Sequence, residues 1–519
     1  MKELNTFEAS LHRSAKLVKE WGDHKLPDNR SLRSLLTIKG ISMWDVLTVE
    51  LALYLVPDSL AKTVKPRTLR HVLTPYLRTI KYAFWNPSVL NTSDCAKWPS
   101  GKTALFLGFS DYLARDIFHP VMSLIAEDER ITPVLLSDNR EMHLGFQHVH
   151  SMHRHRTQYC IDESISIRKL ILKATAQLVS LNAYRSIFCE NGISLWKQLR
   201  HSIKRAFRVH ASYILPDIIA VALHILKVHK PSVIISIDTA DPRTRIYSLI
   251  AKSLGIPVVQ IQSGAVGPEA TEWRFFLDDL VMAQGHQSKK FFVYHGVPDD
   301  KIYITGSPKY DRITTASKAE ISQVKARFDI EEKTLIILLA SSYSLEIFEN
   351  NLSKTTELLM EMKKAIFSCA TKYPELTIIV KPHPIEDVQK TKLLAKGIKN
   401  IVFADAKENI RPLICACDAF ITFGSTTTLD GIILEKPTIC PAFPGWIISD
   451  NFIKTGLVPA PESEDEISKL LEEIICDGGS RMIQHNSEKR RKFLDEVVLD
   501  DGNAAARRIV DSLYRISEC

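Results

Sequence analysis

The sequence predicts an α/β protein with two doubly wound, Rossmann-like domains that face a cleft, together with an N-terminal helical extension. Two observations support this fold class. From residue 99 onward, short apolar stretches typical of buried strands alternate with helical stretches, and such alternation builds parallel sheets covered by helices. A charged helical stretch, 313–332, interrupts the alternation once, so the 519 residues form two series rather than one.

The interruption and the ends of the alternation divide the chain into five parts. We assign 1–98 to the helical extension, 99–312 to the first Rossmann-like domain, 313–332 to a linker, 333–462 to the second domain and 463–519 to a C-terminal helical tail. Ligands of open parallel sheets bind at the carboxyl ends of the strands. We therefore expect the chemistry in the loops that follow the strands, where the two domains face each other.

The composition excludes several classes of protein. With 45% hydrophobic and 24% charged residues, the chain is an ordinary globular protein rather than a disordered or fibrous one. The 67 Lys and Arg residues exceed the 60 Asp and Glu residues only slightly, and no nucleic-acid-binding motif is present, so we expect no nucleic acid partner. Scattered cysteines, the lack of a signal-peptide pattern and the lack of a long apolar run favour a cytoplasmic protein.

The helical extension carries an excess of positive charge. Residues 1–90 contain 14 Lys and Arg against 8 Asp and Glu, a net charge of +6. Apolar residues recur at helical spacing in 31–36 and 44–55, and 66–85 mixes basic with aromatic side chains. Such a mixture is typical of a helix on an anionic bilayer, but also of a helix packed on the next domain with its basic face in water. A peripheral contact of residues 1–95 with the inner membrane face is therefore one interpretation.

Six apolar stretches of the first domain have the length and composition of buried strands. They are 103–110, 131–138, 232–238, 257–264, 279–285 and 301–308. Between the second and the third lies 139–160, which holds five histidines. These histidines lack the helical spacing and the interleaved carboxylates of a metal site, so we predict a mobile, partly basic loop and no metal.

Two loops of the first domain carry polar side chains at strand ends. The loop 261–273 contains Glu269, a candidate general base for an acceptor hydroxyl. The stretch 306–311 contains Ser307, a candidate donor-binding residue if the segment is a hinge that faces the cleft. Each loop is also compatible with an ordinary structural turn.

The second domain begins the alternation anew, and its second strand runs into a basic turn. Its predicted strands are 334–342, 376–384, 400–405, 419–425 and 437–443. Lys381 and His383 belong to the sequence Lys-Pro-His-Pro, whose prolines hold the strand exit rigid and project the histidine at the sheet edge. A histidine there can donate to a phosphate oxygen beside the positive charge of the lysine, or it can be a solvated residue in a rigid turn.

A glycine and a run of hydroxyl side chains connect the fourth strand to a helix predicted over 427–434. The connection consists of Gly424, Ser425, Thr426 and Thr427. Backbone N–H groups and hydroxyls gathered at a helix start can bind an anion, and the same residues can also serve as a plain helix cap. Because Asp430 follows in the same helix, we favour phosphate or sugar binding.

These segments, in this order, resemble the GT-B superfamily of sugar-nucleotide enzymes over about 100–460. The segments are Gly-Phe-Ser-Asp at 108–111, Gly-Ser-Pro-Lys-Tyr-Asp at 306–311, Lys-Pro-His-Pro at 381–384 and the run from Gly424 to Pro437. The likeness is greatest to bacterial capsule and surface-polysaccharide transferases, namely CDP-glycerol polymerases, polysialyltransferases and CMP-Kdo transferases. UDP-N-acetylglucosamine 2-epimerase has a similar plan. The chain departs from several relatives at Gln262-Ser263-Gly264, where they have His-Gly.

The resemblance implies a metal-independent glycosyltransferase without a bound cofactor, which moves a sugar from a nucleotide-sugar donor to a surface glycan or a lipid-linked acceptor. It places the acceptor in the first domain and the donor in the second. It assigns His383 and the hydroxyls of 425–427 to the donor and makes Glu269 a candidate base. Two alternatives stay open, a sugar-nucleotide enzyme similar to UDP-GlcNAc 2-epimerase and a non-catalytic scaffold module in polysaccharide assembly.

Overall fold

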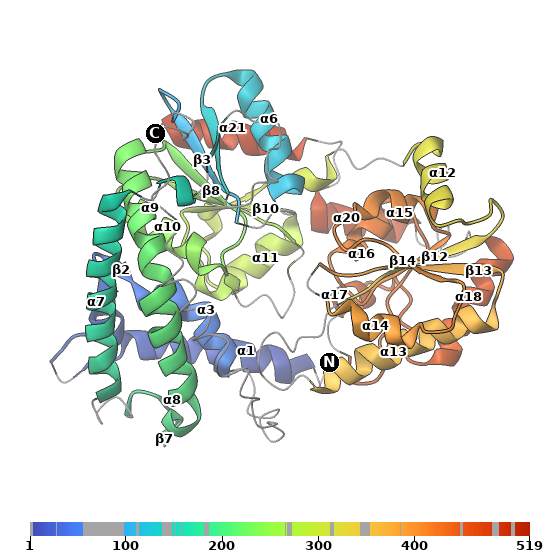
Figure 1. The fold of residues 1–519 in the computed structure, drawn as a ribbon, viewed down its shortest axis with the longest axis horizontal. Coiled ribbons are helices and arrows are strands. Elements are labelled where there is room, and N and C mark those ends of the chain that lie inside the picture. The colour runs from blue at the N-terminus through green and yellow to red at the C-terminus, as the bar shows by residue number, and fades with distance from the viewer. Residues whose placement is uncertain are drawn as a thin grey trace. The chain divides into compact units, whose positions relative to one another are not determined.

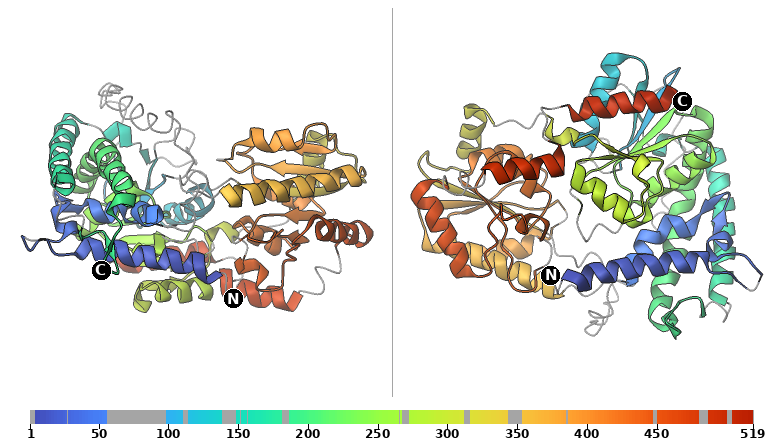
Figure 2. Two further views of the ribbon diagram at one scale, coloured as in Figure 1. Left: turned by 90° about the horizontal axis from the view of Figure 1, so that it is seen from below. Right: turned by 180° about the vertical axis from the view of Figure 1, so that it is seen from behind.

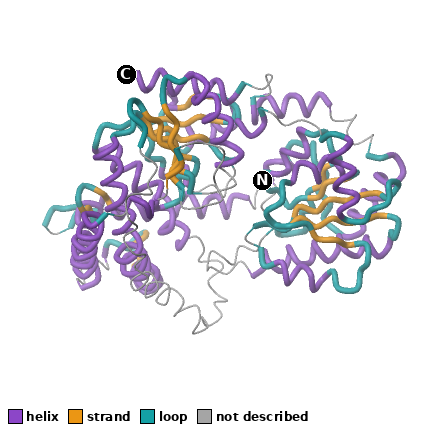
Figure 3. The backbone as a smooth tube through the Cα atoms, turned by 45° about the horizontal axis from the view of Figure 1, so that its top comes forward, coloured by secondary structure: helices purple, strands orange, loops and turns teal. Residues whose placement is uncertain are grey.

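The computed structural model consists of two α/β units, each with a parallel sheet of its own (Figure 1). Unit 1 comprises Met1–Asp311 and Asp501–Cys519, and unit 2 comprises Arg312–Asp500. The structure describes residues 4–26, 28–55, 98–109, 114–137, 148–150, 152–155, 157–180, 186–264, 266, 272–311, 316–342, 353–384, 386–446, 450–479, 487–499 and 504–518. In each unit, helices surround the strands (Figure 3), which confirms the predicted fold class of two doubly wound domains.

Unit 1 contains a seven-stranded parallel sheet in the order β11-β10-β9-β8-β3-β4-β5. Its strands are β3 (Thr103–Leu107), β4 (Thr132–Leu136), β5 (Val149–His150), β8 (Val233–Ser236), β9 (Val258–Ile261), β10 (Leu280–Ala283) and β11 (Ile302–Ile304). Along β3, Leu105 and Leu107 join one apolar core, and Ala104 and Phe106 join another on the opposite face. Because both faces are covered, the strands appear in the sequence as unbroken apolar runs.

The helices of unit 1 include those predicted over 31–36 and 44–55, which are confirmed. The helices are α1 (Leu4–Asp23), α2 (Leu32–Leu35), α3 (Met43–Leu55), α6 (His119–Asp128), α7 (Gln158–Ser180), α8 (Trp196–Arg205), α9 (Leu215–His229), α10 (Pro242–Ser253), α11 (His286–Tyr294) and α21 (Ala505–Glu518). The π-helical segment η6 (Ala206–Ile214) joins α8 to α9 without a break. A short antiparallel pair, β6 (Cys189–Glu190) and β7 (Ile193–Ser194), precedes α8.

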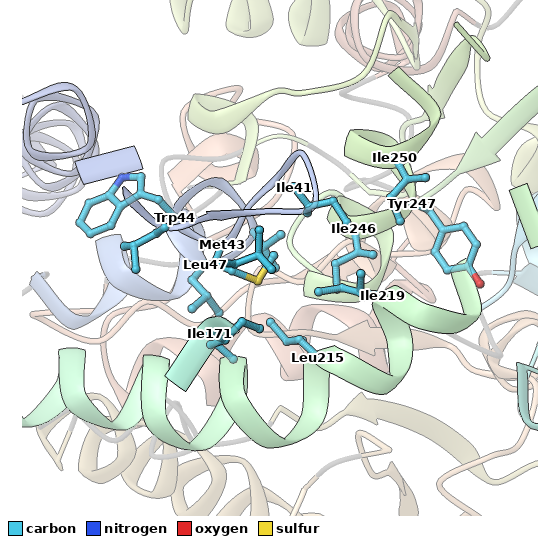
Figure 4. Packing of buried hydrophobic residues seen from close by; sticks show 14 of the residues in the cluster. Ile41, Met43, Trp44, Leu47, Ile171, Leu215, Ile219, Ile246, Tyr247 and Ile250 are labelled. Atoms are coloured by element: carbon cyan, nitrogen blue, oxygen red, sulfur yellow. The ribbon is translucent and has the colours of Figure 1, made fainter. Parts of the chain in front are cut away.

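The described N-terminal helices belong to the core of unit 1. Trp44 of α3 and Leu215 of α9 lie in one apolar cluster that also takes side chains from α7 and α10 (Figure 4). Arg245 of α10 is 2% exposed. Its Nε donates to the carbonyl oxygen of Asp45 at 2.8 Å, and its Nη2 donates to Thr48 Oγ1 at 3.1 Å. These bonds fasten α3 to the helix that follows β8.

Residues 56–97 lie outside the described part of the chain, so the basic and aromatic helix predicted over 66–85 stays a prediction. None of the helices in the described part combines the length and the apolar character that crossing a bilayer requires.

The described part of the histidine-rich stretch, 148–150 and 152–155, is partly buried, which corrects the prediction of a mobile loop there, whereas 139–147 lie outside the described residues. Its described residues form β5 and the 3-10 turn η4 (Met152–His155). His150 and His155 are 1% and 8% exposed, and His155 Nε2 lies 3.3 Å from His150 Nδ1. The ring of Trp98 stacks on His229 of α9, with centroids 4.2 Å apart, and both rings lie against His155. The aromatic surfaces supply a packing that a run of polar residues does not reveal.

The predicted C-terminal helical tail divides between the two units. Its helices α18 (Glu464–Asp477) and α20 (Ser487–Val498) belong to unit 2, whereas α21 belongs to unit 1 and packs on α6 and β8 (Figure 2). Asp311 holds the start of α21, because its Oδ1 accepts the backbone N–H of Ala505 at 2.9 Å and its Oδ2 that of Ala506 at 2.6 Å. Further along α21, Ile509 is fully buried.

Unit 2 contains a five-stranded parallel sheet in the order β14-β13-β12-β15-β16, and its strands lie where the sequence predicts them. The strands are β12 (Leu335–Ala340), β13 (Leu376–Lys381), β14 (Ile401–Phe403), β15 (Ala419–Ile421) and β16 (Thr438–Ile439). The other helices of the unit are α12 (Lys318–Arg327), α13 (Ser353–Lys372), α14 (Val388–Leu394), α15 (Ile410–Ala416), α16 (Thr427–Ile433) and α17 (Asp450–Ile453). The helix of the predicted linker, α12, packs on α15.

Candidate functional site

The carboxyl edge of the unit 2 sheet is the place where its topology predicts a ligand. The chain enters at β12, continues outward through β13 and β14 on one side, and then returns to form β15 and β16 on the other. The loops after β12 and β15 therefore leave in opposite directions, and ligands of doubly wound sheets bind at this reversal. We call the described loops there, residues 341–342, 382–384 and 422–427, the switch-point edge.

His383 lies at the switch-point edge, directly after β13. Its backbone N–H donates to Glu386 Oε2 at 3.1 Å. The residue is half-buried, and desolvation lowers the pKa of its imidazole; the Glu386 carboxylate opposes this shift and the Lys381 ammonium adds to it. The ring is therefore neutral near pH 7 and has one N–H to donate.

Lys381, the last residue of β13, is engaged with backbone carbonyl groups. Its Nζ donates to the carbonyl oxygen of Pro382 at 3.2 Å and to that of Ala406 at 2.7 Å. Burial lowers the pKa of the ammonium, while the carboxylates of Glu408 and Asp405 raise it. Lys381 thus ties the loop after β14 to the exit of β13, and its contact with a donor stays a prediction.

The hydroxyl turn, residues 424–427, connects β15 to α16 as predicted. Gly424 has a φ of +82°, a left-handed conformation that glycine adopts without steric cost. Ser425 Oγ and Thr427 Oγ1 hydrogen-bond to each other at 2.5 Å, and the side chain of Thr426, the N-cap residue of α16, makes no capping bond. All four residues are half-buried. The side chain of the N-cap residue thus caps no backbone N–H group. Contact of Gly424, Ser425, Thr426 and Thr427 with a donor stays a prediction.

A buried layer supports the hydroxyl turn. Thr428 Oγ1 lies 2.7 Å from Thr422 Oγ1, and both side chains are fully buried. A Cβ atom at Gly431 would lie 2.6 Å from Cδ1 of Phe420, closer than real Cβ atoms approach. Only glycine at this position lets α16 pack so closely on β15. The predicted donor residue Asp430 is 3% exposed in this layer, and its contact with a donor stays a prediction.

The loop that carries His383 and the hydroxyl turn leave the two strands that flank β12. Neighbouring strands lie roughly 4.8 Å apart, so the exits of β13 and β15 are about 10 Å apart along the edge. The loop of His383 and the hydroxyl turn are therefore close enough along the edge to contact one extended ligand. This arrangement can bind an anion and stabilise charge that develops on it.

A buried ion pair, which the sequence analysis missed, anchors the loop of His383. Lys363 Nζ of α13 lies 2.7 Å from Glu386 Oε1, and the two side chains are 2% and 4% exposed. Glu386 Oε1 also accepts from Ser341 Oγ at 2.8 Å and from Thr391 Oγ1 at 2.7 Å. One carboxylate thus joins the end of β12, the helices α13 and α14, and the backbone of His383.

For the candidate residues of unit 1, the structure supplies less geometry than for those of unit 2. Glu269 lies outside the described residues, so its role as base stays a prediction. Ser307 is 3% exposed, and its Oγ has no hydrogen-bond partner in the described part of the chain. Gln262 is buried: its Oε1 accepts the backbone N–H of Gln284 at 2.8 Å and its Nε2 donates to Ser288 Oγ at 2.9 Å. Among the described residues, no group of His, Cys, Asp or Glu side chains could hold a metal ion.

A protein-family model described as CDP-glycerol:poly(glycerophosphate) glycerophosphotransferase matches residues 262–515. The matched segment is just under half of the chain, and it contains every candidate site residue named above. No curated protein is significantly similar to the chain in sequence.

Solved structures with similar folds include UDP-GlcNAc 2-epimerase from Neisseria meningitidis bound to UDP-GlcNAc, with 17% identity, a TM-score of 0.50, and coverage of 80% of this chain and all of the other. The complex of MnaA from S. aureus with UDP has 12% identity, a TM-score of 0.51 and coverage of 80% and 96%. A putative UDP-N-acetylglucosamine 2-epimerase from Listeria monocytogenes has 10% identity, a TM-score of 0.51 and coverage of 80% and 97%. At these identities the likeness concerns the fold alone. The family match supports a transferase of a glycosyltransferase-like type.

Proposed function

We propose that the chain is a metal-independent GT-B glycosyltransferase, which moves a sugar from a nucleotide-sugar donor to a hydroxyl of a surface glycan or a lipid-linked acceptor. One observation carries the proposal: a histidine whose pKa is lowered by burial and a turn of hydroxyls that do not cap the following helix flank the switch point of the unit 2 sheet. The family match runs through both segments. The similar fold from N. meningitidis holds UDP-GlcNAc, a ligand of the proposed class.

Each donor contact has a role in this proposal. His383 donates its ring N–H to a phosphate oxygen of the donor, and the hydroxyl turn 424–427 donates to the other phosphate group or to the nucleoside. Lys381 adds positive potential next to the histidine. Asp430 and Ser307 complete the predicted donor contacts.

In the transfer, the acceptor hydroxyl oxygen attacks the anomeric carbon of the donor. The bond between that carbon and the phosphate oxygen breaks, and the nucleoside diphosphate leaves with the electron pair. Glu269, the candidate base, takes the proton of the hydroxyl. His383 and the hydroxyl turn stabilise the charge that forms on the leaving phosphate. If these residues stabilise the leaving phosphate without a metal ion, EDTA in the assay should leave the transfer rate unchanged. A rate that EDTA abolishes and an added divalent cation restores would contradict the metal-independent proposal.

A second candidate function is the transfer of glycerol phosphate from CDP-glycerol, which the family match favours. The acceptor hydroxyl would then attack the phosphorus that bears glycerol, the bond to the second phosphate would break, and CMP would leave. The same edge of unit 2 would hold the cytidine and its phosphates. The resemblance implies a histidine in several relatives where this chain has Gln262, and Gln262 is buried.

Thermal unfolding with added donors tests both candidates. We expect one class among CMP-, CDP-, UDP- and GDP-sugars and CDP-glycerol to stabilise the wild type, by about 2.7 kcal/mol at a hundredfold excess over the dissociation constant. His383→Ala should abolish most of this stabilisation because it removes a phosphate contact. His286→Ala, which changes an exposed histidine of unit 1, should leave it unchanged. A wild type that none of these donors stabilises would count against both candidates.

Product analysis separates the alternatives. An epimerase turns over UDP-GlcNAc without any acceptor, whereas a transferase needs one. A scaffold module transfers nothing, and His383→Ala then changes neither a product nor the binding of a donor.

A further inference from the structure

The positive charge of the chain is concentrated in two stretches of unit 1, namely residues 1–90 and the helical segment 164–216. Residues 164–216 contain nine Lys and Arg and a single acidic residue, Glu190, which makes 9 − 1 = +8. The whole chain carries +7, so all remaining residues together sum to −1. Glu190 is itself paired with Arg13 of α1. The segment therefore has almost no acidic partners of its own.

Most of the charged segment lies in an antiparallel pair of helices, which we call the basic hairpin: α7 and the continuous run of α8, η6 and α9. The hairpin contains nine Lys and Arg against three acidic residues, which makes 9 − 3 = +6. Three contacts fix its register, namely the rings of Tyr159 and His224 at 6.2 Å, the hydrogen bond from Ser164 to Asp217, and Arg168 Nε to the carbonyl oxygen of Ser212 at 3.1 Å. Along these pairs the residue numbers rise on α7 as they fall on the other helix. Helix α7 therefore packs along α9 (Figure 1) and along η6.

The outer face of α7 combines aliphatic and basic side chains. Ile165, Lys169, Leu172 and Lys173 follow one another at helical spacing, and all four are exposed, Ile165 to 46% and Leu172 to 39%. Large apolar side chains that stay this exposed carry a free-energy cost unless a partner covers them.

The other arm of the hairpin has the same character. At its start, the exposed cations Lys197 and Arg200 follow β7, where Ile193 is 69% exposed. Both arms thus present exposed cations, and exposed aliphatic side chains lie on α7 and directly before α8.

We propose that the basic hairpin binds the surface of a bilayer that contains anionic phospholipids, with the cations on the headgroups and the aliphatic side chains at the headgroup boundary. Basic and apolar side chains on one helix face are the combination that such a surface selects. A polyanion such as a nucleic acid would pair with the cations but would leave the aliphatic side chains uncovered. The contact is separate from the one predicted for residues 1–95, and it does not depend on the transfer reaction.

Flotation of the full-length protein with vesicles tests the proposal. We expect the wild type to float with vesicles of phosphatidylcholine and phosphatidylglycerol and to stay behind with phosphatidylcholine alone. Lys169→Glu with Lys173→Glu should lower the bound fraction about tenfold at low salt, because charge attraction supplies much of the affinity. Ile165→Ser with Leu172→Ser should lower it several-fold, including at high salt.

A matched control has the same chemistry elsewhere in unit 1. Lys252 and Leu254 at the end of α10 are both exposed, and Lys252→Glu with Leu254→Ser should leave flotation unchanged. All the changed side chains are exposed, so unaltered thermal unfolding verifies that each variant folds. Three outcomes would overturn the proposal: a wild type that floats with neither vesicle, a charge variant that floats as well as the wild type, or an aliphatic variant with undiminished flotation. An aliphatic variant that floats like the wild type and still binds polyphosphate would indicate that the ligand of the basic hairpin is a soluble polyanion and not a bilayer.

Discussion

Glu386 is the residue on which the position of His383 depends. Its carboxylate accepts hydrogen bonds from two hydroxyls, an ammonium and the backbone N–H of His383, and none of these donors lies on the same element as another. A buried carboxylate with this many partners holds a single geometry. The loop that carries the proposed phosphate contact is therefore fixed before any donor arrives.

Glu386→Gln should destabilise unit 2, because it leaves the ammonium of Lys363 buried without a charged partner. Breaking a buried pair by removing one member costs about 3 kcal/mol or more. Urea unfolding followed by tryptophan fluorescence and circular dichroism measures the change. Glu472→Gln is the matched control. Glu472 is the exposed partner of Lys372, which lies on α13 like Lys363, so its loss should not move the midpoint of unfolding. Equal midpoints for the two variants would show that the buried pair does not hold the loop.

The two halves of the candidate site differ in how far the sequence could predict them. His383 and the hydroxyl turn follow apolar strands directly, and a strand end in a parallel sheet is a local feature that a sequence displays. Glu386 and Lys363 are 23 residues apart and meet only because β13 returns beside β12. The only local indication of the pair is a lysine among the apolar positions of a helix, and the sequence does not show which residue is its partner.

Among the elements, the parallel strands could be predicted and the turn with β5 and η4 could not. Strands buried on both faces are continuous apolar runs, and the helices between them are bounded by glycine and proline. The turn is polar in sequence but is buried, because Trp98 and His229 cover His155. Such a contact depends on a residue far along the chain, so local periodicity does not contain it.

The histidine cluster should make unit 1 sensitive to acid. Burial, together with the neighbouring His150, His229 and His224, lowers the pKa of His155 from 6.5 to about 3. The unfolded chain takes up a proton below about pH 6.5, whereas the folded chain takes it up only near pH 3. The stabilisation is therefore complete above pH 6.5 and is lost between pH 6.5 and 3, by up to about 1.4 kcal/mol per pH unit.

Unfolding in urea at a series of pH values measures this loss. His155→Gln should flatten the pH dependence between pH 6.5 and 4, because glutamine does not titrate. His286→Ala, at an exposed position, should leave the slope of the wild type intact. A wild type whose stability does not fall in this range would contradict the burial of a neutral His155.

At the scale of the whole molecule, the chain passes between the units twice. It leaves unit 1 after Asp311, forms unit 2, and returns so that α21 completes unit 1. Apolar side chains of α21, among them Ile509 and Leu513, are buried with those of β3 and β8. Helical spacing could predict α21 itself, but not the unit on which it packs, because both sheets offer apolar faces.

Asp311→Ala should weaken the docking of α21, because the aspartate accepts two backbone N–H groups at its first turn. Losing such a cap costs about 1 kcal/mol, so the free energy of unfolding of unit 1 should fall by that amount. Hydrogen exchange of the α21 amides and urea unfolding both report it. Asp511→Ala changes an exposed aspartate on the same helix and serves as the comparison. Unchanged protection of α21 in Asp311→Ala would show that the cap contributes nothing.

The return of the chain to unit 1 also determines the order in which the two units can fold during translation. A ribosome releases the residues of unit 2 before it reaches the helix that closes unit 1, so the second unit can fold while the first still lacks a covering for part of its sheet. During that interval the apolar surface that α21 later occupies is open to other chains, and a chaperone that shields it would be needed most when translation is slow.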